Sequence, residues 1–313
     1  MKTAAVLPAL GIGDAILMMI ASHRLYLSGF QVTTFHDSLP ELASWFPDQS
    51  FEKNPSDEEL INRLNLFDLI IAENDNSPRI KKLIAAFRGQ SSERLSIFYP
   101  TYFQAKHGLL HSTDKVFDPD RPMAENIGEA IANLLHKEDP SKNNGITPPL
   151  PLKHRVHSNR IIIHPTSRVP SKNWSSHKFL NLAKQLKDRG YDPHFCVSPA
   201  ERPQWENALQ FGCSLPHFSN LSELAAFIFE SGFHIGNDSL LGHLASNLNI
   251  PTLIIADDEK RMRLWRPGWQ SGEVVLPPQW IPNPRIFCWK KNHWQRLISV
   301  RKVFKKFNKL NKF

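Results

Sequence analysis

Short apolar runs alternate with longer periodic segments through the first half of the chain. The runs predict β-strands, and the segments in which apolar residues recur every three or four positions predict helices. The expected strands are residues 4–7, 31–35, 68–72 and 95–99, and the expected helices are residues 14–27, 79–87 and 124–136. This alternation is typical of a parallel sheet covered by helices on both faces.

The pattern is interrupted at residues 136–159, where proline, asparagine, glycine and charged residues predict a linker. The alternation then restarts, with expected strands at residues 160–164, 193–197, 233–235 and 252–256, and expected helices at residues 177–189, 202–211, 222–230 and 239–248. We therefore expect two α/β domains, residues 1–140 and 159–290, joined by a linker at 141–158 and separated by a cleft.

The last 40 residues differ from the rest in charge. Residues 274–313 contain ten Lys and Arg and no Asp or Glu, so the rest carries −2 although the whole chain carries +8. Apolar side chains recur at helical spacing in residues 291–313, which predicts a basic amphipathic helix. Two interpretations stay open: the helix lies on an anionic membrane surface, or it packs against the first domain with its basic face in solvent. A nucleic-acid partner is not expected, because no RNA-binding module is present.

Composition narrows the class of protein. The chain is 41% hydrophobic and 22% charged, as ordinary globular proteins are. Cys196, Cys213 and Cys288 form no CxxC pair, which favours a reducing compartment, and we expect a cytoplasmic protein. Asp14 interrupts the apolar N-terminal stretch and no run approaches 18 apolar residues, so no transmembrane helix is expected.

The segment "GNDSLLGH" places Asn237 and Asp238 at the end of an expected strand and Ser239 at the start of the next helix. Unpaired N–H groups and the positive end of the helix dipole favour a phosphate or diphosphate at such a position. The alternative is that Asp238 or Ser239 only caps the helix.

A second polar loop follows the strand at residues 160–164. Its Thr166, Ser167, Arg168 and Lys172 could hold phosphate oxygens, although the loop could equally be a solvated basic surface. Glu201 follows the next strand, where a carboxylate can accept hydrogen bonds from ribose hydroxyls, or can simply complement a helix dipole.

Near the N-terminus, Gly11 and Gly13 follow the first strand, but Ile16 stands where a dinucleotide fingerprint has its third glycine. A nicotinamide enzyme is therefore not expected. The turn presents Asp14 as a general base or as a helix cap. No HExxH or other metal-spaced set appears, so no metal site is expected, and the carboxylates of "ADDEK" at 256–260 are interpreted as helix caps.

Together these stretches resemble glycosyltransferase family 9, the bacterial heptosyltransferases of lipopolysaccharide core assembly. "IIIHPTSRVPSKNW" is similar to the donor loop of the family, and "GNDSLLGHLASNLNIPTLII" to its Gly-Asn-Asp-Thr-Gly-x-x-His segment. "GIGDAIL" is similar to its Gly-Asp turn. The resemblance implies a GT-B fold: an α/β protein of two Rossmann-like domains facing across a cleft, the first binding the acceptor and the second a nucleotide-sugar.

The implied reaction is inverting, metal-independent glycosyl transfer without a cofactor. The donor is a nucleotide-diphosphate sugar, of which ADP-heptose is the best known, and the acceptor a lipid-linked saccharide of the lipopolysaccharide-core type at the inner face of the cytoplasmic membrane. By carry-over, Asp14 is the base on the acceptor loop of Gly11 and Gly13. The expected donor site comprises Thr166, Ser167, Lys172, Glu201, Asn237, Asp238, Ser239 and His243.

One departure from the family pattern affects the expected donor site. Leu240 stands where the family usually has glycine, and its side chain could crowd the diphosphate. The alternative function is therefore a catalytically degenerate GT-B protein that binds a nucleotide or glycan without transfer.

Overall fold

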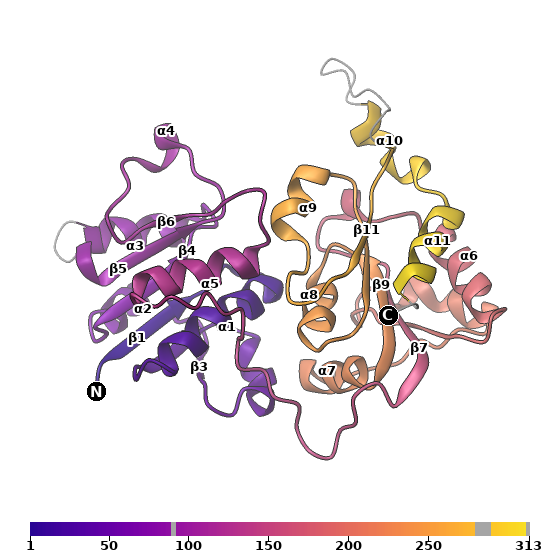
Figure 1. The fold of residues 1–313 in the computed structure, drawn as a ribbon, viewed down its shortest axis with the longest axis horizontal. Helices are drawn as coiled ribbons and strands as arrows, with labels where there is room; N and C mark the ends of the chain where they lie inside the picture. The colour runs from indigo at the N-terminus through magenta and orange to yellow at the C-terminus, as the bar shows by residue number, and fades with distance from the viewer. Residues whose placement is uncertain (89–91, 279–288, 311–313) are drawn as a thin grey trace. The chain divides into compact units, whose positions relative to one another are not determined.

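The structure is a computed structural model that describes residues 1–88, 92–278 and 289–310. The chain divides into two compact units, Met1–Pro149 and Leu150–Phe313 (Figure 1). Each unit is built on one parallel sheet, which confirms the α/β class expected from the alternating pattern.

The first unit carries a six-stranded sheet within the described residues. Its strands are β1 (Thr3–Leu7), β2 (Gln31–Phe35), β3 (Ser50–Glu52), β4 (Leu69–Glu73), β5 (Leu95–Tyr99) and β6 (Lys115–Val116). Its α-helices are α1 (Ile12–Tyr26), α2 (Asp57–Leu64), α3 (Pro78–Arg88), α4 (Gln104–His107) and α5 (Met123–Leu134), with 3-10 helices η1 (Leu39–Trp45) and η2 (Ser92–Arg94). Every strand and helix expected here is found. The unexpected β3 and β6 are edge strands of three and two residues, too short for a periodic pattern.

The first sheet has the order β3-β2-β1-β4-β5-β6. The chain passes from β1 to β2 on one side and later returns to β4 on the other side, so β1 and β4 flank a topological switch point. Because side chains alternate along each strand, one face packs on α2 and α3 and the other on α1, which α5 contacts. In open α/β sheets ligand crevices form at the carboxyl ends of the strands at such a point.

Much of the segment expected as a linker packs on the first unit. Asn144 is 1% exposed and its amide nitrogen donates to the carbonyl of Ile16 at 3.1 Å, while Thr147 N donates to the carbonyl of Trp45 at 2.8 Å. Gly128 of α5 lies against the backbone of Pro140, where a Cβ would come within 2.6 Å of the carbonyl oxygen. The division between the units falls at Pro149 and Leu150, inside the expected 141–158 range.

The second unit carries a five-stranded sheet within the described residues, of order β11-β10-β9-β7-β8. Its strands are β7 (His157–His164), β8 (Asp192–Phe195), β9 (Ser231–Asn237), β10 (Thr252–Ile255) and β11 (Glu273–Val275). Its helices are α6 (Ser176–Lys187), α7 (Leu221–Phe229), α8 (Leu240–Asn247), α9 (Glu259–Trp265), α10 (Trp289–Leu297) and α11 (Val300–Leu310), with η3 (Pro170–Lys172) and η4 (Arg202–Phe211). The four strands and three of the helices expected here are found, the helix expected at 202–211 is the 3-10 helix η4, and α9 and β11 were not anticipated.

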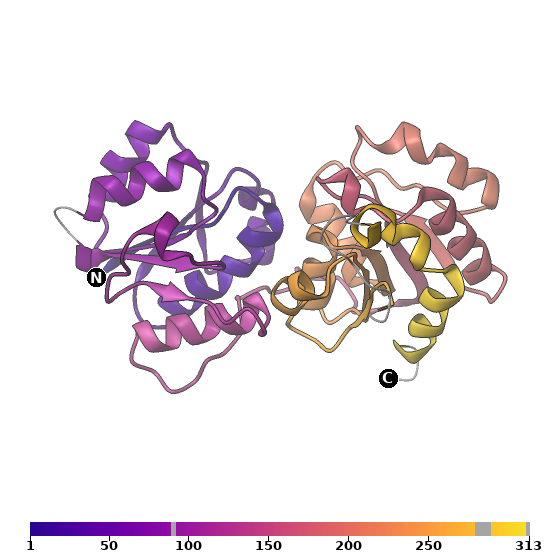
Figure 2. The ribbon, with the colours of Figure 1, turned by 90° about the horizontal axis from the view of Figure 1, so that it is seen from above.

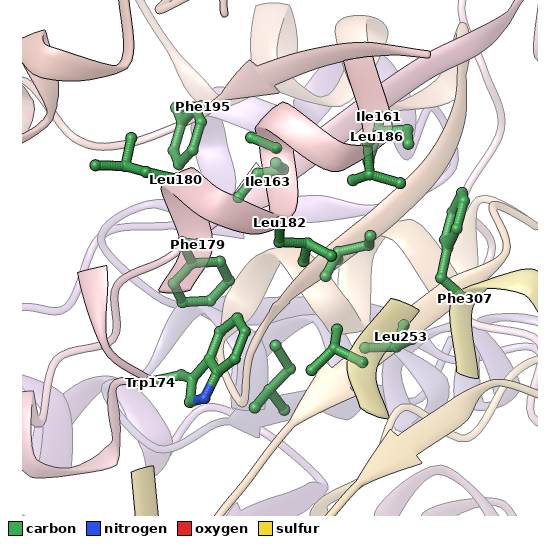
Figure 3. Packing of buried hydrophobic residues seen from close by; sticks show 14 of the residues in the cluster. Ile161, Ile163, Trp174, Phe179, Leu180, Leu182, Leu186, Phe195, Leu253 and Phe307 are labelled. Carbon is green, nitrogen blue, oxygen red and sulfur yellow. The ribbon is translucent and has the colours of Figure 1, made fainter. Parts of the chain in front are cut away.

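One face of the second sheet is covered by α6, η4 and α11, which share a single apolar cluster with the strands. Figures 1 and 2 show α6 and α11 side by side, and Figure 3 shows Phe307 of α11 near Leu253 of β10, with Trp174 and Phe179 at another end of the cluster. Trp174 and Phe179 pack edge to face with their ring centroids 5.0 Å apart. The opposite face contacts α7 and α8.

The C-terminal segment contains two helices where one was expected. α10 ends at Leu297, and the Ser299 hydroxyl accepts a hydrogen bond from Lys302 N at 3.2 Å, a local bond typical of a helix start. The apolar stripe is buried in the core of the second unit: Trp294 is 1% exposed, and Val303 and Phe307 are 0% exposed. Its apolar face is therefore covered by the protein's own core, and its exposed face is basic.

None of the helices in the described ranges is both long and apolar enough to span a membrane.

Candidate functional site

In the first unit, the turn after β1 presents Asp14 at the start of a helix. Gly11 is the N-cap of α1, and Asp14 stands at the third helical position, partly buried. A Cβ on Gly11 would overlap the Asp14 carboxylate as it stands, so the absence of a side chain on Gly11 leaves room for Asp14 to fold back over the helix start. Gly13 lies in the same first turn. The positive end of the helix dipole favours an ionised carboxylate at this position.

Glu73, at the end of β4, lies beside this turn. It is 2% exposed, and its Oε2 accepts a hydrogen bond from Ala9 N at 3.1 Å. Burial, followed by the negative charge of Asp14 and that of Asp75, raises the pKa of Glu73 well above its ordinary value, and the hydrogen bond from Ala9 offsets this only in part. Two carboxyl groups therefore share the switch point of the first sheet.

His36 approaches the same turn from β2, on the opposite side of β1. It is 2% exposed, its Nε2 lies 3.4 Å from the carbonyl oxygen of Leu10, and its Nδ1 accepts from Ser38 N at 3.1 Å. Burial lowers the pKa of His36, so the ring is neutral at neutral pH. The turn is thus held from both neighbouring strands.

In the second unit, Asn237 joins two turns at the end of β9. The side chain is fully buried, its Oδ1 accepts from Trp174 N at 2.9 Å and its Nδ2 donates to the carbonyl of Pro165 at 2.6 Å. Both polar ends of the amide are engaged inside the protein. Asn237 therefore fixes the loop after β7 against the end of β9.

The start of α8 is left without a side-chain cap. Ser239 is the N-cap residue, yet its hydroxyl caps no backbone N–H, and its buried Oγ has no hydrogen-bond partner in the described part of the chain. Asp238 is turned aside into an ion pair with Arg261, whose Nε lies 3.2 Å from its Oδ2. Neither residue takes the capping role weighed in the sequence, so the first N–H groups of α8 have no capping side chain within residues 1–88, 92–278 and 289–310. Leu240 occupies the first helical position and is partly exposed.

Lys172 ends the 3-10 helix η3 in the loop after β7. It is partly buried, and within the described ranges no hydrogen bond or ion pair engages its ammonium group. Ser167 stabilises the loop internally, because its hydroxyl lies 2.7 Å from Asn173 Oδ1 and 3.0 Å from the carbonyl of Val169. Arg168 is exposed.

The C-terminal segment donates two side-chain hydrogen bonds to this loop. Trp294 Nε1 donates to the carbonyl of Ser171 at 3.0 Å, and Gln295 Nε2 donates to the carbonyl of Asn173 at 3.0 Å. Lys178 of α6 in turn donates to the C-terminal segment: its ammonium lies 2.6 Å from the carbonyl of Gln295 and 2.9 Å from that of Ile298. A cation is favourable at carbonyls at the end of a helix such as α10.

Glu201 follows β8 at the start of η4. Its Oε2 accepts from the Ser198 backbone N at 2.9 Å and the Ser198 hydroxyl at 2.7 Å. Burial alone would raise the pKa of Glu201, but these hydrogen bonds and the nearby Thr166 hydroxyl outweigh it and lower the pKa. Glu201 is therefore a carboxylate at neutral pH. Thr166 itself is 6% exposed.

His243 and His234 lie near the α8 end of the site. His243 is 5% exposed, its Nδ1 has no partner among the described residues, and burial lowers its pKa while Asp238 opposes the shift. His234 is fully buried, and burial lowers its pKa to about 3, so both rings are neutral.

The acidic stretch after β10 caps a helix, as the sequence predicted. Asp258 accepts from Arg261 N at 2.7 Å as the N-cap of α9, and Asp257 Oδ1 lies 2.6 Å from the Arg261 guanidinium. In the part of the chain that the structure describes, no group of three His, Cys, Asp or Glu residues is arranged to hold a metal ion.

Sequence reasoning missed several contributors to the site. Glu73 ends an apolar strand and is the first polar residue of "LIIAE", a signal that could have been read in the same way as "GND". Arg261, which pairs with Asp238, and the Trp294–Gln295 contact with the donor-like loop depend on long-range packing, for which the sequence carries no local signal.

Similar solved structures define the class of fold. The ADP-heptose lps heptosyltransferase II of Escherichia coli has a TM-score of 0.68 at 17% identity, with 99% of this chain and 98% of that chain covered. A glycosyl transferase family 9 structure from Veillonella parvula gives 0.70 at 17% identity over 99% and 97% of the two chains. The Escherichia coli heptosyltransferase WaaC with ADP gives 0.64 at 13% identity over 99% and 100%. The fold is therefore GT-B, with two Rossmann-like units.

The family follows from the sequence match. The model for glycosyltransferase family 9 (heptosyltransferase) matches residues 104–269, more than half of the 313 residues, and this chain belongs to that family. Lipopolysaccharide heptosyltransferase 3 of Escherichia coli is 29% identical over 126 residues, 38% of this chain. The match covers 36% of that relative, so the chain spans about a third of the length of the curated relative it matches.

Proposed function

We propose that the protein is an inverting, metal-independent glycosyltransferase that moves a sugar from a nucleoside-diphosphate donor to a saccharide acceptor. The observation that carries the proposal is that, among the described residues, no side chain caps the start of α8 and none pairs with the ammonium of Lys172 in the same unit. The second unit binds the donor, and the first unit binds the acceptor through the turn that presents Asp14.

The donor diphosphate is held by groups that need no metal ion. The Ser239 hydroxyl and the first N–H groups of α8 donate to phosphate oxygens, and Lys172 supplies a cation as negative charge develops on the leaving diphosphate. Thr166 and His243 flank this position, and Glu201 accepts from the ribose hydroxyls. Asn237 and Ser167 act through the turns that they stabilise, and Asp238 through its pair with Arg261.

Asp14 is the general base. The acceptor hydroxyl oxygen attacks the anomeric carbon, its proton passes to the Asp14 carboxylate, and the bond to the diphosphate oxygen breaks with its electron pair leaving on the nucleoside diphosphate. Inversion follows, because the attack occurs on the face opposite to the leaving group. The helix dipole of α1 favours negative charge at this position, and the room left by Gly11 lets the carboxylate fold back over the helix start.

The names of the relatives support a narrower assignment. The family is described as heptosyltransferase, one curated relative is a lipopolysaccharide heptosyltransferase 3, one similar structure is an ADP-heptose lps heptosyltransferase II, and another heptosyltransferase was solved with ADP. We propose ADP-heptose as the donor and a lipid-linked saccharide as the acceptor. The exposed cations Arg301, Lys305 and Lys309 of α11 would meet anionic headgroups electrostatically, since the apolar side of that helix is buried.

The deciding experiment is a calorimetric titration of the protein with ADP, UDP and GDP in EDTA. Micromolar binding of one nucleotide, weakened in Lys172→Ala but unchanged in the matched control Lys184→Ala on the exposed side of α6, supports the donor site. A transfer assay with the sugar form of that nucleotide follows. If none of the three nucleotides binds, the proposed donor site is wrong.

The second candidate function is binding without transfer, which the side chain of Leu240 at the α8 start favours. Leu240→Gly distinguishes the two. A large gain in turnover would show that Leu240 limits the chemistry, whereas tight nucleotide binding with no transfer in either protein would favour the binding function.

A further inference from the structure

The switch points of the two sheets are built on the same plan. In the first sheet β1 is flanked by β2 and β4, and in the second β7 is flanked by β8 and β9. Leu7 pairs with Ala72 in one sheet, and His164 pairs with Gly236 in the other. In both sheets the residue that follows this central strand, β1 or β7, is a proline: Pro8 in the first sheet and Pro165 in the second.

The next residue on the flanking strand is Glu73 in the first sheet and Asn237 in the second. Both side chains are buried and both hold the turn that follows the central strand, Glu73 through Ala9 N at 3.1 Å and Asn237 through the carbonyl of Pro165 at 2.6 Å. The two residues therefore occupy equivalent positions and perform the same structural task.

The two residues differ in that an amide is always neutral and a carboxyl group need not be. The charged groups that act on Glu73 are the carboxylates of Asp14 on α1 and Asp75 in the loop after β4, and both are negative. His36, the titratable group that holds the turn from β2, is neutral. In the described part of the chain no Lys or Arg forms an ion pair with Glu73. An ionised Glu73 would thus be a buried charge beside two like charges, which is strongly unfavourable.

We propose that Glu73 is a positioning residue that works as a neutral carboxylic acid: it holds the turn after β1 through Ala9 N and leaves Asp14 as the ionised carboxylate of this switch point. The catalytic consequence rests on the proposed function of Asp14, but the protonation state of Glu73 does not. Glu73 in its neutral form is the counterpart of Asn237.

This assignment predicts a distinctive pH dependence of stability. The pKa of Glu73 is raised in the folded protein, so the folded state binds this proton more tightly than the unfolded state. The contribution of Glu73 to stability is fully present below the ordinary pKa of about 4.3 and is lost progressively as the pH rises towards the folded pKa. Glu73→Gln is a permanent copy of the neutral form and removes this loss.

The test compares the wild type, Glu73→Gln, Glu73→Leu and Asp14→Asn by urea denaturation between pH 4 and pH 8. The urea midpoint of Glu73→Gln should match the wild type at pH 4 and exceed it increasingly as the pH rises, and Asp14→Asn should reduce the pH dependence of the wild type. A Glu73→Gln midpoint that stays a fixed distance from the wild type at every pH, or falls below it at pH 8, overturns the proposal.

Transfer kinetics give the second readout. Glu73→Gln should keep kcat and both KM values close to the wild type, while Glu73→Leu, which leaves Ala9 N without its acceptor, should lower kcat on the order of 10²-fold through misplacement of Asp14. A Glu73→Gln variant as inactive as Asp14→Asn would mean that the ionised Glu73 takes part in catalysis, which contradicts the proposal. If the wild type transfers no sugar, the proposed function fails, and the denaturation series still decides the state of Glu73.

Discussion

The two units hold their switch-point turns in the same way but surround them with opposite chemistry. In the first unit the turn leads to a helix start that carries its own carboxylate, Asp14, with a second carboxyl group, Glu73, behind it. In the second unit the turn leads to Lys172, and the carboxylate nearest to the α8 start, Asp238, is paired with Arg261.

This difference teaches which helix start is available to an anionic ligand. Both helix starts carry partial positive charge. At the start of α1 the Asp14 carboxylate already lies close to this positive charge. At the start of α8 the N-cap residue is Ser239, whose buried hydroxyl has no partner in the described ranges. A diphosphate would therefore be favoured at α8 and repelled at α1, where a hydroxyl that gives up a proton is the better ligand.

Substitution of Asp14 should give the largest effect and should separate the roles of the two units. Asp14→Asn should lower the transfer rate on the order of 10²–10⁴-fold, because the amide cannot accept the acceptor proton. Nucleotide affinity should not change, since the donor is assigned to the other unit. Rate and affinity are measured on the same preparation, and full transfer activity in the variant would remove Asp14 from the base role.

Asn237→Asp places a carboxyl group at the second switch point and so imitates the first. We expect a loss of about 2–4 kcal/mol in the free energy of unfolding at pH 7, because the carbonyl of Pro165 loses its donor and the new carboxylate is buried at a position where, among the described residues, Trp174 N alone donates to the present side chain. The loss should shrink towards pH 4 as the new group takes up a proton. Urea denaturation at both pH values measures it, and Asn237→Asp as stable as the wild type at pH 7 would contradict the assigned role.

Lys172 tests the chemistry of the second unit rather than its architecture. Lys172→Ala should weaken nucleoside-diphosphate binding about 10- to 100-fold, the effect of losing one charged hydrogen bond of about 1.5–3 kcal/mol. Adenosine binding should change little, because adenosine lacks the phosphates. Calorimetry with ADP and adenosine separates the two cases, and equal weakening of both would point to a disturbed loop instead.

Much of this comparison was present in the sequence, because its signals are local. Apolar runs followed by "GIGD" and "GNDS" identify two strand ends with helix starts, and those strands and helices are found. The sequence could not show which polar residue at each strand end faces a ligand and which is bonded inside the protein. Asn237 looked like a ligand group, yet its partners Pro165 and Trp174 lie 72 and 63 residues away in the chain.

The same limit explains the missed Glu73 and the C-terminal segment. Ala9, the partner of Glu73, is 64 residues distant, and the pairing exists only because β4 returns to the side of β1. The apolar stripe of the last helices was visible as a pattern, but a pattern does not say which surface covers it. Here the core of the second unit covers it, and the same stripe would have suited a membrane equally well.

The smallest effect concerns the support of the Lys172 loop, for which the first unit offers no parallel. Gln295→Ala removes the donor to the carbonyl of Asn173 and, with it, about 0.5–1.5 kcal/mol of net hydrogen bonding. Part of that loss should appear as nucleotide binding weakened about two- to fivefold, although Gln295 itself touches no ligand in the proposed site. Lys305→Ala, on the exposed side of α11, is the matched control and should bind as the wild type does. Added to Lys172→Ala, Gln295→Ala should cause no further loss, because an ordered loop without its ammonium has little left to offer the diphosphate; additive losses would mean that Gln295 acts on the donor by another route.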